Sequence, residues 1–177
     1  MRPDWNGIYP ALTTKFTKND KLDIPLYLKN IESQINAGVH GCVIAGSLGE
    51  ASTLSQKEKI SLLDATIAHV DGRIPVIMNI AEQSTSKAVK AAHNAQKSGA
   101  DGLMMLPPMR YLADSFETVE FYKSVAISCD LPIMIYNNPY DYKIEITISM
   151  FEELLKVNNI RATKESTRDV TNVTRLK

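Results

Sequence analysis

The feature that most constrains this chain is a regular alternation of short β-rich runs with helical patterns. Six such runs recur roughly every 30 residues, the length of one βα unit, and they cover 8–13, 39–45, 75–80, 102–106, 132–136 and 160–164. Several runs are almost continuously apolar, as expected of parallel strands that are buried on both faces. An alternation of this kind predicts an α/β fold with a parallel sheet.

Apolar stripes at helical spacing fill the intervals between the runs. The stripe within 28–35 is followed by Gly38, a residue type that commonly ends helices. Ser55 and Glu58 form an S-x-x-E capping box ahead of the next stripe. Further stripes lie within 60–70, 88–95, 116–126 and 151–155. We interpret all of these stripes as helix faces that pack against the sheet.

Two closures of a parallel sheet are possible, an open doubly wound sheet and a barrel. No G-x-G-x-x-G follows the first run, which argues against the dinucleotide-binding form of the open sheet. A (β/α)8 TIM barrel needs eight strands and about 250 residues. This chain has 177 residues and stops in a sixth predicted helix over 169–176. Because an unclosed barrel exposes strand edges, we predict a single catalytic barrel domain, 1–177, truncated at its C-terminus after about six βα units.

The bulk composition excludes several classes of partner. The 20 basic and 20 acidic side chains balance, which gives no electrostatic reason to expect nucleic acid or an anionic membrane. No window approaches the ~18 apolar residues of a membrane span, and the N-terminus lacks a signal-peptide pattern. Cys42 and Cys129 are far apart, as in a protein with free thiols in a reducing cytoplasm. The three histidines are dispersed without ligand spacing, so we predict no metal site.

Three predicted strands end in residues that could carry chemistry, and in a βα barrel function gathers at the carboxyl ends of the strands. Lys164 ends the apolar run 160–164, where a buried ammonium is costly. Exclusion of water favours the neutral amine, which attacks carbonyl carbons and yields an iminium that acts as an electron sink. Spacing alone favours the other interpretation, a solvated strand-end lysine.

The other two strand ends could assist such a lysine. Tyr136 ends the neighbouring run, so its phenol could lie beside Lys164 and transfer protons as a carbinolamine forms and collapses. A tyrosine there could equally serve packing. The turn 46–49 could offer free backbone N–H groups and the Ser47 hydroxyl to a carboxylate. Glycine turns after strands are common, so this signal is weak by itself.

Together these pieces resemble the family of dihydrodipicolinate synthase and N-acetylneuraminate lyase. The family has a G-[ST]-x-G-E turn, a Y-N-x-P segment and a K-E lysine on the sixth strand. Here the three motifs read Gly46-Ser47-Leu48-Gly49-Glu50, Tyr136-Asn137-Asn138-Pro139 and Lys164-Glu165. The resemblance extends from about Trp5 to the end of the chain.

The resemblance implies a role for each motif. Lys164 would form a Schiff base with C2 of a 2-oxo acid, and Tyr136 would relay protons. Ser47 and the N–H of Leu48 would hold the α-carboxylate. The resemblance also implies that no metal or organic cofactor takes part. It further implies a homo-oligomer, either a dimer or a tetramer.

Three departures argue against the synthase within this family. At the position of Leu48 the synthase usually has a threonine that joins the proton relay. Shortly after Y-N-x-P it has an arginine for the carboxylate of aspartate semialdehyde, where this chain has Asp141. The synthase also has a P-Y-Y relay tyrosine, where the stretch 107–111 places Arg110 and then Tyr111. The roles of Arg110 and Tyr111 are left open by the sequence.

One branch of the family fits these departures better. The segments 5–14, 107–111 and 135–139 look like the hydroxyproline-catabolic Δ1-pyrroline-4-hydroxy-2-carboxylate deaminases. Such enzymes convert a cyclic 2-imino acid to 2-oxoglutarate semialdehyde and ammonia. The alternatives are the synthase itself and a 2-keto-3-deoxy sugar acid aldolase. From a different class, a noncatalytic barrel homologue or an inert fragment is also possible.

Overall fold

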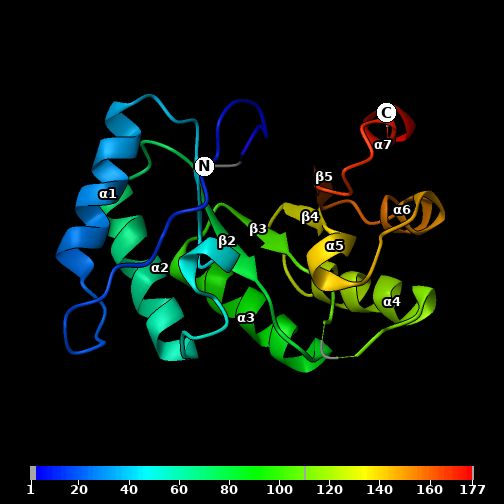
Figure 1. Ribbon diagram of the computed structural model, residues 1–177, viewed down its shortest axis with the longest axis horizontal. Coiled ribbons are helices and arrows are strands. Elements are labelled where there is room, and N and C mark those ends of the chain that lie inside the picture. Colours follow the sequence, from blue (N-terminus) through cyan, green and yellow to red (C-terminus); the bar gives the residue numbers. More distant parts are fainter. Residues whose placement is uncertain (1–2, 110, 177) are drawn as a thin grey trace. The chain divides into compact units, whose positions relative to one another are not determined.

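The computed structural model describes residues 3–109 and 111–176, and in them strands alternate with helices throughout (Figure 1). In chain order the elements are α1 (Ile24–Asn36), β1 (Cys42–Ile44), η1 (Ser47–Gly49), α2 (Gln56–Val70), β2 (Val76–Ile80), α3 (Thr85–Ser98), β3 (Gly102–Met105), α4 (Ser115–Ala126), β4 (Ile133–Asn137), α5 (Pro139–Tyr142), α6 (Ile148–Leu154), β5 (Ile160–Glu165) and α7 (Thr171–Arg175).

The strands form one sheet in the order β1-β2-β3-β4-β5, and the pairs β1–β2 and β4–β5 are parallel. Strands that neighbour one another in chain order, with a helix between them, are the arrangement of a (β/α)8 barrel. The predicted fold class is therefore confirmed, as a partial barrel. By its contacts the chain forms two compact units. One holds the described residues up to Asn79 with Asn94–Leu103, and the other holds Ile80–His93 with those from Met104 onward.

The first predicted strand, 8–13, is less regular than expected. The structure has only an isolated parallel bridge there, between Ala11 and Val43. The Leu12 N–H donates to the Val43 carbonyl at 2.9 Å, and the Val43 N–H donates to the carbonyl of Pro10 at 2.9 Å. Proline has no N–H to donate and so shortens the ladder. The prediction of a full strand here is wrong, although the segment does lie alongside β1.

Side-chain caps define the helices of the first unit. The predicted capping box is present, since the Glu58 N–H donates to Ser55 Oγ at 3.3 Å and the Ser55 N–H donates to Glu58 Oε2 at 2.8 Å. Asp23 caps α1 by accepting from the Leu26 N–H at 3.0 Å. β1 and β2 are buried along their whole length, as predicted for strands covered on both faces. Cys42 lies in this core, where burial raises the pKa of its thiol to about 12.

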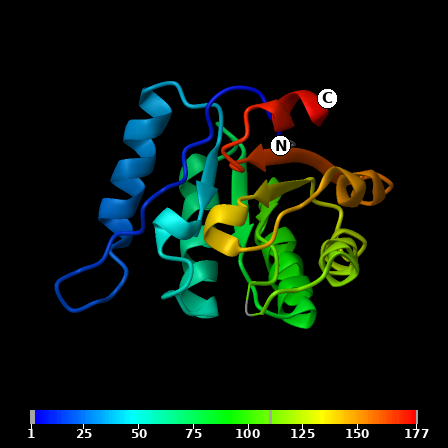
Figure 2. The same ribbon diagram turned by 45° about the vertical axis from the view of Figure 1, so that its right-hand side comes forward.

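In the second unit β4 and β5 lie side by side (Figure 2). A shift in their register decides which of their residues pair. Ile133 pairs with Ile160, but the next residue, Met134, pairs with Ala162, so Arg161 is passed over. A bulge of this kind moves every later pair by one residue. In consequence Tyr136 lies opposite Lys164.

No helix in 3–109 and 111–176 is long and apolar enough to cross a membrane.

Candidate active site

The predicted nucleophile and proton relay lie against each other in the second unit. Lys164 Nζ lies 3.9 Å from the centroid of the Tyr136 ring, over its face. The two residues form a register pair on neighbouring parallel strands, so both side chains project from the same face of the sheet. This adjacency is what the strand-end positions of the two residues predicted.

The Tyr136 ring face is a favourable neighbour for the Lys164 amino group. An aromatic face attracts an ammonium through the ring quadrupole, by about 0.5–2 kcal/mol depending on exposure. Both side chains are half-buried, so the exclusion of water expected from the sequence is incomplete in the described part of the chain. The residue whose ring Lys164 contacts also carries a hydroxyl, a group that can transfer protons.

The Tyr136 hydroxyl is held from one side by Asn138. The Asn138 amide donates from Nδ2 to Tyr136 Oη at 3.1 Å and to Asp141 Oδ2 at 2.7 Å. The Asp141 N–H returns a bond to Asn138 Oδ1 at 3.3 Å, which caps the short helix α5. Because Oη accepts from the amide, the phenol proton is directed elsewhere. Tyr142 packs edge-on against Tyr136, with ring centroids 5.4 Å apart.

Asn138 was missed by the sequence analysis. The available signal was its place within Y-N-x-P, two residues after the tyrosine, at a position from which a side chain can bond back to a local partner. It is buried, with 5% of its surface exposed, so its amide requires such partners. Asn138 is the x of Y-N-x-P, which the family pattern leaves unspecified, and its amide contacts the hydroxyl of Tyr136, the predicted proton relay.

The opposite face of the same two strands is closed by hydrogen bonds. Asn137 is fully buried, and its Nδ2 donates to Glu165 Oε2 at 3.0 Å and to the Ile146 carbonyl at 3.2 Å. Its Oδ1 accepts from the Ile146 N–H at 2.9 Å. Glu165 Oε1 accepts from the Thr167 N–H at 2.8 Å. Asn137 of Y-N-x-P and Glu165 of K-E therefore hold the ends of β4 and β5 to the loops that follow them.

The glycine turn of the first unit uses more of its own N–H groups than expected. Gly49 donates to the Gly46 carbonyl at 2.9 Å, Ala51 to the same carbonyl at 3.2 Å, and Glu50 to the Ser47 carbonyl at 3.1 Å. The expectation that the turn 46–49 leaves its N–H groups free is wrong for Gly49, and the N–H groups of the two residues after the turn are also bonded. The Leu48 N–H lies at the start of the η1 helix, where no intrahelical acceptor exists.

The turn requires glycine at position 49. A Cβ there would lie 2.8 Å from the Leu12 carbonyl oxygen, and the Gly49 carbonyl accepts a buried bond from Thr14 Oγ1 at 2.6 Å. Leu48 is 70% exposed. Ser47 and Leu48 belong to the first unit, whereas the Lys164–Tyr136 pair belongs to the second. Carboxylate binding by this turn stays a prediction.

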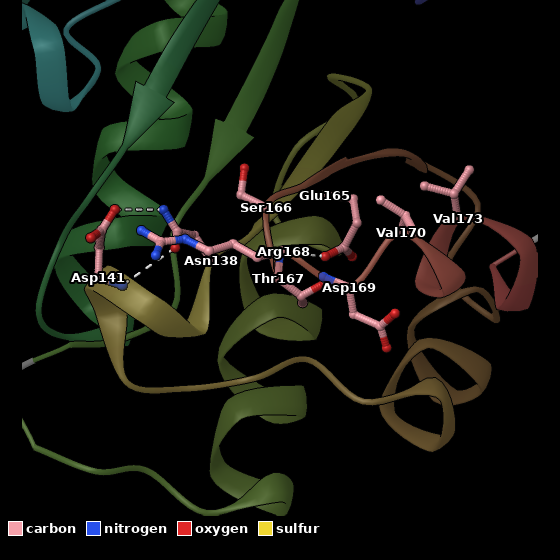
Figure 3. A pocket seen from close by; sticks show the side chains of 9 residues that line it. All are labelled: Asn138, Asp141, Glu165, Ser166, Thr167, Arg168, Asp169, Val170 and Val173. Carbon is pink, nitrogen blue, oxygen red and sulfur yellow. Dashed lines mark hydrogen bonds between the residues drawn. The ribbon is translucent and has the colours of Figure 1, made fainter.

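A cavity of about 410 Å³ lies in the second unit and is lined by Asn138, Asp141, Glu165, Ser166, Thr167, Arg168, Asp169, Val170 and Val173 (Figure 3). Lys164 and Tyr136 are not among its lining residues, and Asn138 connects the two places. The Arg168 guanidinium carbon lies 3.5 Å over the Tyr140 ring.

Arg168 corrects one inference from the sequence. Asp141 stands where the synthase has an arginine, and the sequence therefore predicted no cation nearby. Arg168 lines the same cavity as Asp141, from the loop that follows β5. Asp141 and Arg168 are far apart in the sequence and line one cavity only in the folded chain, so no local motif could have indicated this cation. Arg110 lies outside the described residues, and Tyr111 is 60% exposed.

The histidines have local partners. His69 Nε2 lies 2.9 Å from Glu32 Oε2, His93 Nε2 lies 2.7 Å from the Ser128 carbonyl, and His40 Nδ1 accepts from the Ile8 N–H at 3.1 Å. Among residues 3–109 and 111–176, no three His, Cys, Asp or Glu side chains group as metal ligands.

Comparison with known proteins gives consistent matches over most of the chain. Residues 4–177 match the model of the "Dihydrodipicolinate synthetase family". An "Uncharacterized DapA-like lyase" of Rhizobium meliloti is 34% identical over 168 residues, covering 95% of this chain and 56% of the relative. A 4-hydroxy-tetrahydrodipicolinate synthase of Methanococcoides burtonii is 32% identical over 162 residues, covering 92% and 55%.

Solved structures agree with these matches. A dihydrodipicolinate synthase superposes with a TM-score of 0.94 at 30% identity, covering 97% of this chain and 60% of that protein. YagE, an E. coli K12 prophage protein of the dihydrodipicolinic acid synthase family solved with pyruvate, gives a TM-score of 0.93 at 29% identity, covering 98% and 58%. The chain thus spans 55–60% of the length of these four relatives.

Proposed function

Because the chain belongs to the dihydrodipicolinate synthetase family, we propose that it forms a Schiff base through Lys164 and acts as a class I lyase on a small 2-oxo or 2-imino acid. The observation that carries this proposal is the Lys164 amine over the Tyr136 ring at 3.9 Å. An amine beside a phenol supplies both the nucleophile and the proton transfer that Schiff-base formation needs.

The substrate that we propose is Δ1-pyrroline-4-hydroxy-2-carboxylate. The neutral Lys164 amine adds to C2 of the ring, the C2–N bond to the ring nitrogen breaks, and that nitrogen takes up a proton. The opened chain is held as an iminium on Lys164. Loss of a C3 proton and of the 4-hydroxyl then expels water and leaves an allylic amine at C5. A proton shift from C5 to C3 converts this amine, through its enamine tautomer, into a C5 imine. Hydrolysis of the C5 imine and of the lysine iminium gives 2-oxoglutarate semialdehyde and ammonia, so the net reaction consumes one water.

Two features of the chain support this substrate over a ketone. A cyclic imine is already electrophilic at C2, so the first addition requires less proton relay, which suits an apolar Leu48 in the turn. The substrate also carries a single carboxylate, for which the Ser47 turn would be sufficient. Tyr136 would then protonate the departing ring nitrogen, with its hydroxyl oriented by Asn138.

Condensation of pyruvate with aspartate semialdehyde is the second candidate. Relatives at 32–34% identity carry the name 4-hydroxy-tetrahydrodipicolinate synthase. The Arg168 guanidinium in the cavity beside Asp141 offers a cation that the sequence alone does not indicate. Three carboxylates line the same cavity, which opposes a second substrate anion. A 2-keto-3-deoxy sugar acid aldolase remains the third candidate.

A coupled assay separates these candidates. The natural full-length protein is given the hydroxylated imine, and semialdehyde release is followed with a nicotinamide-dependent dehydrogenase. We expect turnover with this imine and negligible condensation of pyruvate with aspartate semialdehyde. Cleavage of a 2-keto-3-deoxy sugar acid without imine turnover would instead place the protein among the aldolases. No reaction with any of the three would favour a noncatalytic homologue.

We further propose that the protein works in the cytoplasm as a homodimer or homotetramer, without nucleic acid, membrane or cofactor partners. The 20 basic and 20 acidic side chains balance, so the chain has no net positive charge that would attract nucleic acid or an anionic membrane. Sedimentation equilibrium of the natural full-length protein tests the oligomeric state, and a monomer at assay concentrations would contradict it.

A further inference from the structure

The cavity in Figure 3 is linked to Tyr136 by one of its lining residues, Asn138. Asn138 Nδ2 lies 3.1 Å from Tyr136 Oη, and the Asn138 side chain also lines the cavity. A substrate attached to Lys164 at one end and passing the Tyr136 hydroxyl would therefore extend toward this cavity. The residues on its walls would meet the far end of the substrate.

Arg168 is the cation of this cavity. Its guanidinium stacks on Tyr140 at 3.5 Å, and in Figure 3 its side chain extends toward Asn138. Among the described residues, no hydrogen bond or ion pair of Arg168 accompanies this stack. Stacking occupies the flat face of a guanidinium and leaves its N–H edge to donate. Arg168 also has a φ of 66°, a left-handed backbone that a non-glycine residue adopts at a conformational cost.

The charges around Arg168 indicate what it could bind. Asp141, Glu165 and Asp169 line the same cavity, so carboxylates outnumber the single guanidinium. All three carboxylates accept hydrogen bonds from neighbouring residues, Asp141 through Oδ2 from the Asn138 amide at 2.7 Å. A second substrate carboxylate would be repelled by this surplus. A hydroxyl both donates and accepts, and it matches a guanidinium donor beside the Asp141 acceptor.

We propose that Arg168, with Asp141 beside it, is the specificity-determining residue that binds the hydroxyl group at C4 of the substrate. The inference rests on the proposed function and deepens it, because the 4-hydroxyl is the group that must leave. In that step the C3–H bond breaks, its electron pair forms the new C=C bond, and the C4–O bond breaks. The lost proton and hydroxide together make one water. Guanidinium donors at the departing oxygen stabilise the charge that develops there.

The test compares ligands with and without the hydroxyl. In the natural full-length protein, Arg168→Met removes the charge and keeps an unbranched chain. Arg161→Met, at an exposed arginine near the start of β5 that does not line this cavity, is the matched control. The hydroxylated imine and its 4-deoxy analogue, Δ1-pyrroline-2-carboxylate, each compete with pyruvate for borohydride trapping on Lys164. A hydrogen bond from a charged donor predicts a preference of about 10- to 150-fold for the hydroxylated imine.

Arg168→Met should lose this preference and lower kcat/KM for the hydroxylated imine by a similar factor, with only a small change in pyruvate trapping. Arg161→Met should behave as the wild type. If Arg168→Met folds poorly, Arg168→Lys keeps the charge without the planar stack and should lose most of the preference.

The inference is overturned if Arg168→Met retains the preference, if wild type shows none, or if both imines weaken equally. A variant that loses affinity for the dianion 2-oxoglutarate instead would assign Arg168 to a second carboxylate. Failure of wild type to trap pyruvate on Lys164 would overturn the proposed function itself, which keeps the two failures distinguishable.

Discussion

The two faces of the β4–β5 pair differ sharply, although they are built from alternate residues of the same strands. On one face, Asn137 and Glu165 are joined at 3.0 Å and each accepts or donates further bonds to the following loops. On the other face, the Lys164 amine lies over the Tyr136 ring, and both side chains are half-buried. The closed face holds the strand ends to the following loops, and the open face is the one on which we propose that substrate binds.

The difference predicts that substitutions on the two faces have different consequences. Changes on the open face should affect turnover and leave the fold intact. On the closed face, changes at Asn137 should destabilise the strand ends first and affect chemistry only through the loss of folded protein, whereas Glu165 also lines the cavity of Figure 3. Each prediction below tests one side of this division in the natural full-length protein.

Loss of the nucleophile should have the largest effect. Lys164→Arg keeps a cation over the Tyr136 ring but cannot form a Schiff base, so we expect kcat with the hydroxylated imine to fall by at least about a thousandfold. The thermal midpoint should stay within about 3 °C of wild type, because the residue is only half-buried. Lys156→Arg, at an exposed lysine, is the control and should be fully active.

Removal of the relay hydroxyl should have the next largest effect. Tyr136→Phe keeps the ring under the Lys164 amine and removes the group that transfers protons, so kcat should fall by about 10²-fold or more. KM should change by less than about threefold. Steady-state kinetics measure both constants. A rise in KM with kcat unchanged would assign Tyr136 to binding and contradict the relay.

On the closed face, Asn137→Ala should act through stability. The substitution leaves the Glu165 carboxylate and the Ile146 backbone short of a partner in a buried place, which should cost about 2 kcal/mol of unfolding free energy. Chemical denaturation measures this. The activity per folded molecule should stay within about threefold of wild type. A loss of kcat with stability unchanged would contradict the division between the two faces.

The smallest effect should come from Asn138, which touches the open face from its edge. Asn138→Leu removes the amide that donates to Tyr136 Oη, and loss of one such hydrogen bond should lower kcat by about tenfold with little change in KM. Asn138→Gln keeps an amide and should restore part of the rate. Equal losses in both variants, matched by equal losses of stability, would show that Asn138 is purely structural.

Much of this arrangement was predictable from the sequence because local signals specified it. Apolar runs located β1 to β5, and the Ser55 box located the start of α2. The strand-end positions of Lys164 and Tyr136 placed them side by side, since parallel strands of a barrel end at one rim. These features depend on periodicity, capping and topology, which act over a few residues or through a regular fold.

The remaining features depend on contacts that no local pattern specifies. The bulge after Ile133, which passes over Arg161, is set by how β5 packs, yet it decides that Tyr136 faces Lys164. The short helix α5 is only four residues long, too short to show periodicity. Arg168 and Tyr140 are far apart in the sequence, so only the folded chain shows that the guanidinium stacks on the ring.

Borohydride trapping tests the central claim most directly. The natural full-length protein is incubated with pyruvate, reduced, digested and mapped by mass spectrometry, with Lys164→Arg in parallel. The account predicts an added mass of about 72 Da, that of a reduced pyruvate adduct, on the peptide that holds Lys164, formed through the lysine imine. The Lys164→Arg protein should carry none. An adduct on a different lysine, or no adduct in the wild-type protein under conditions of turnover, would contradict the account.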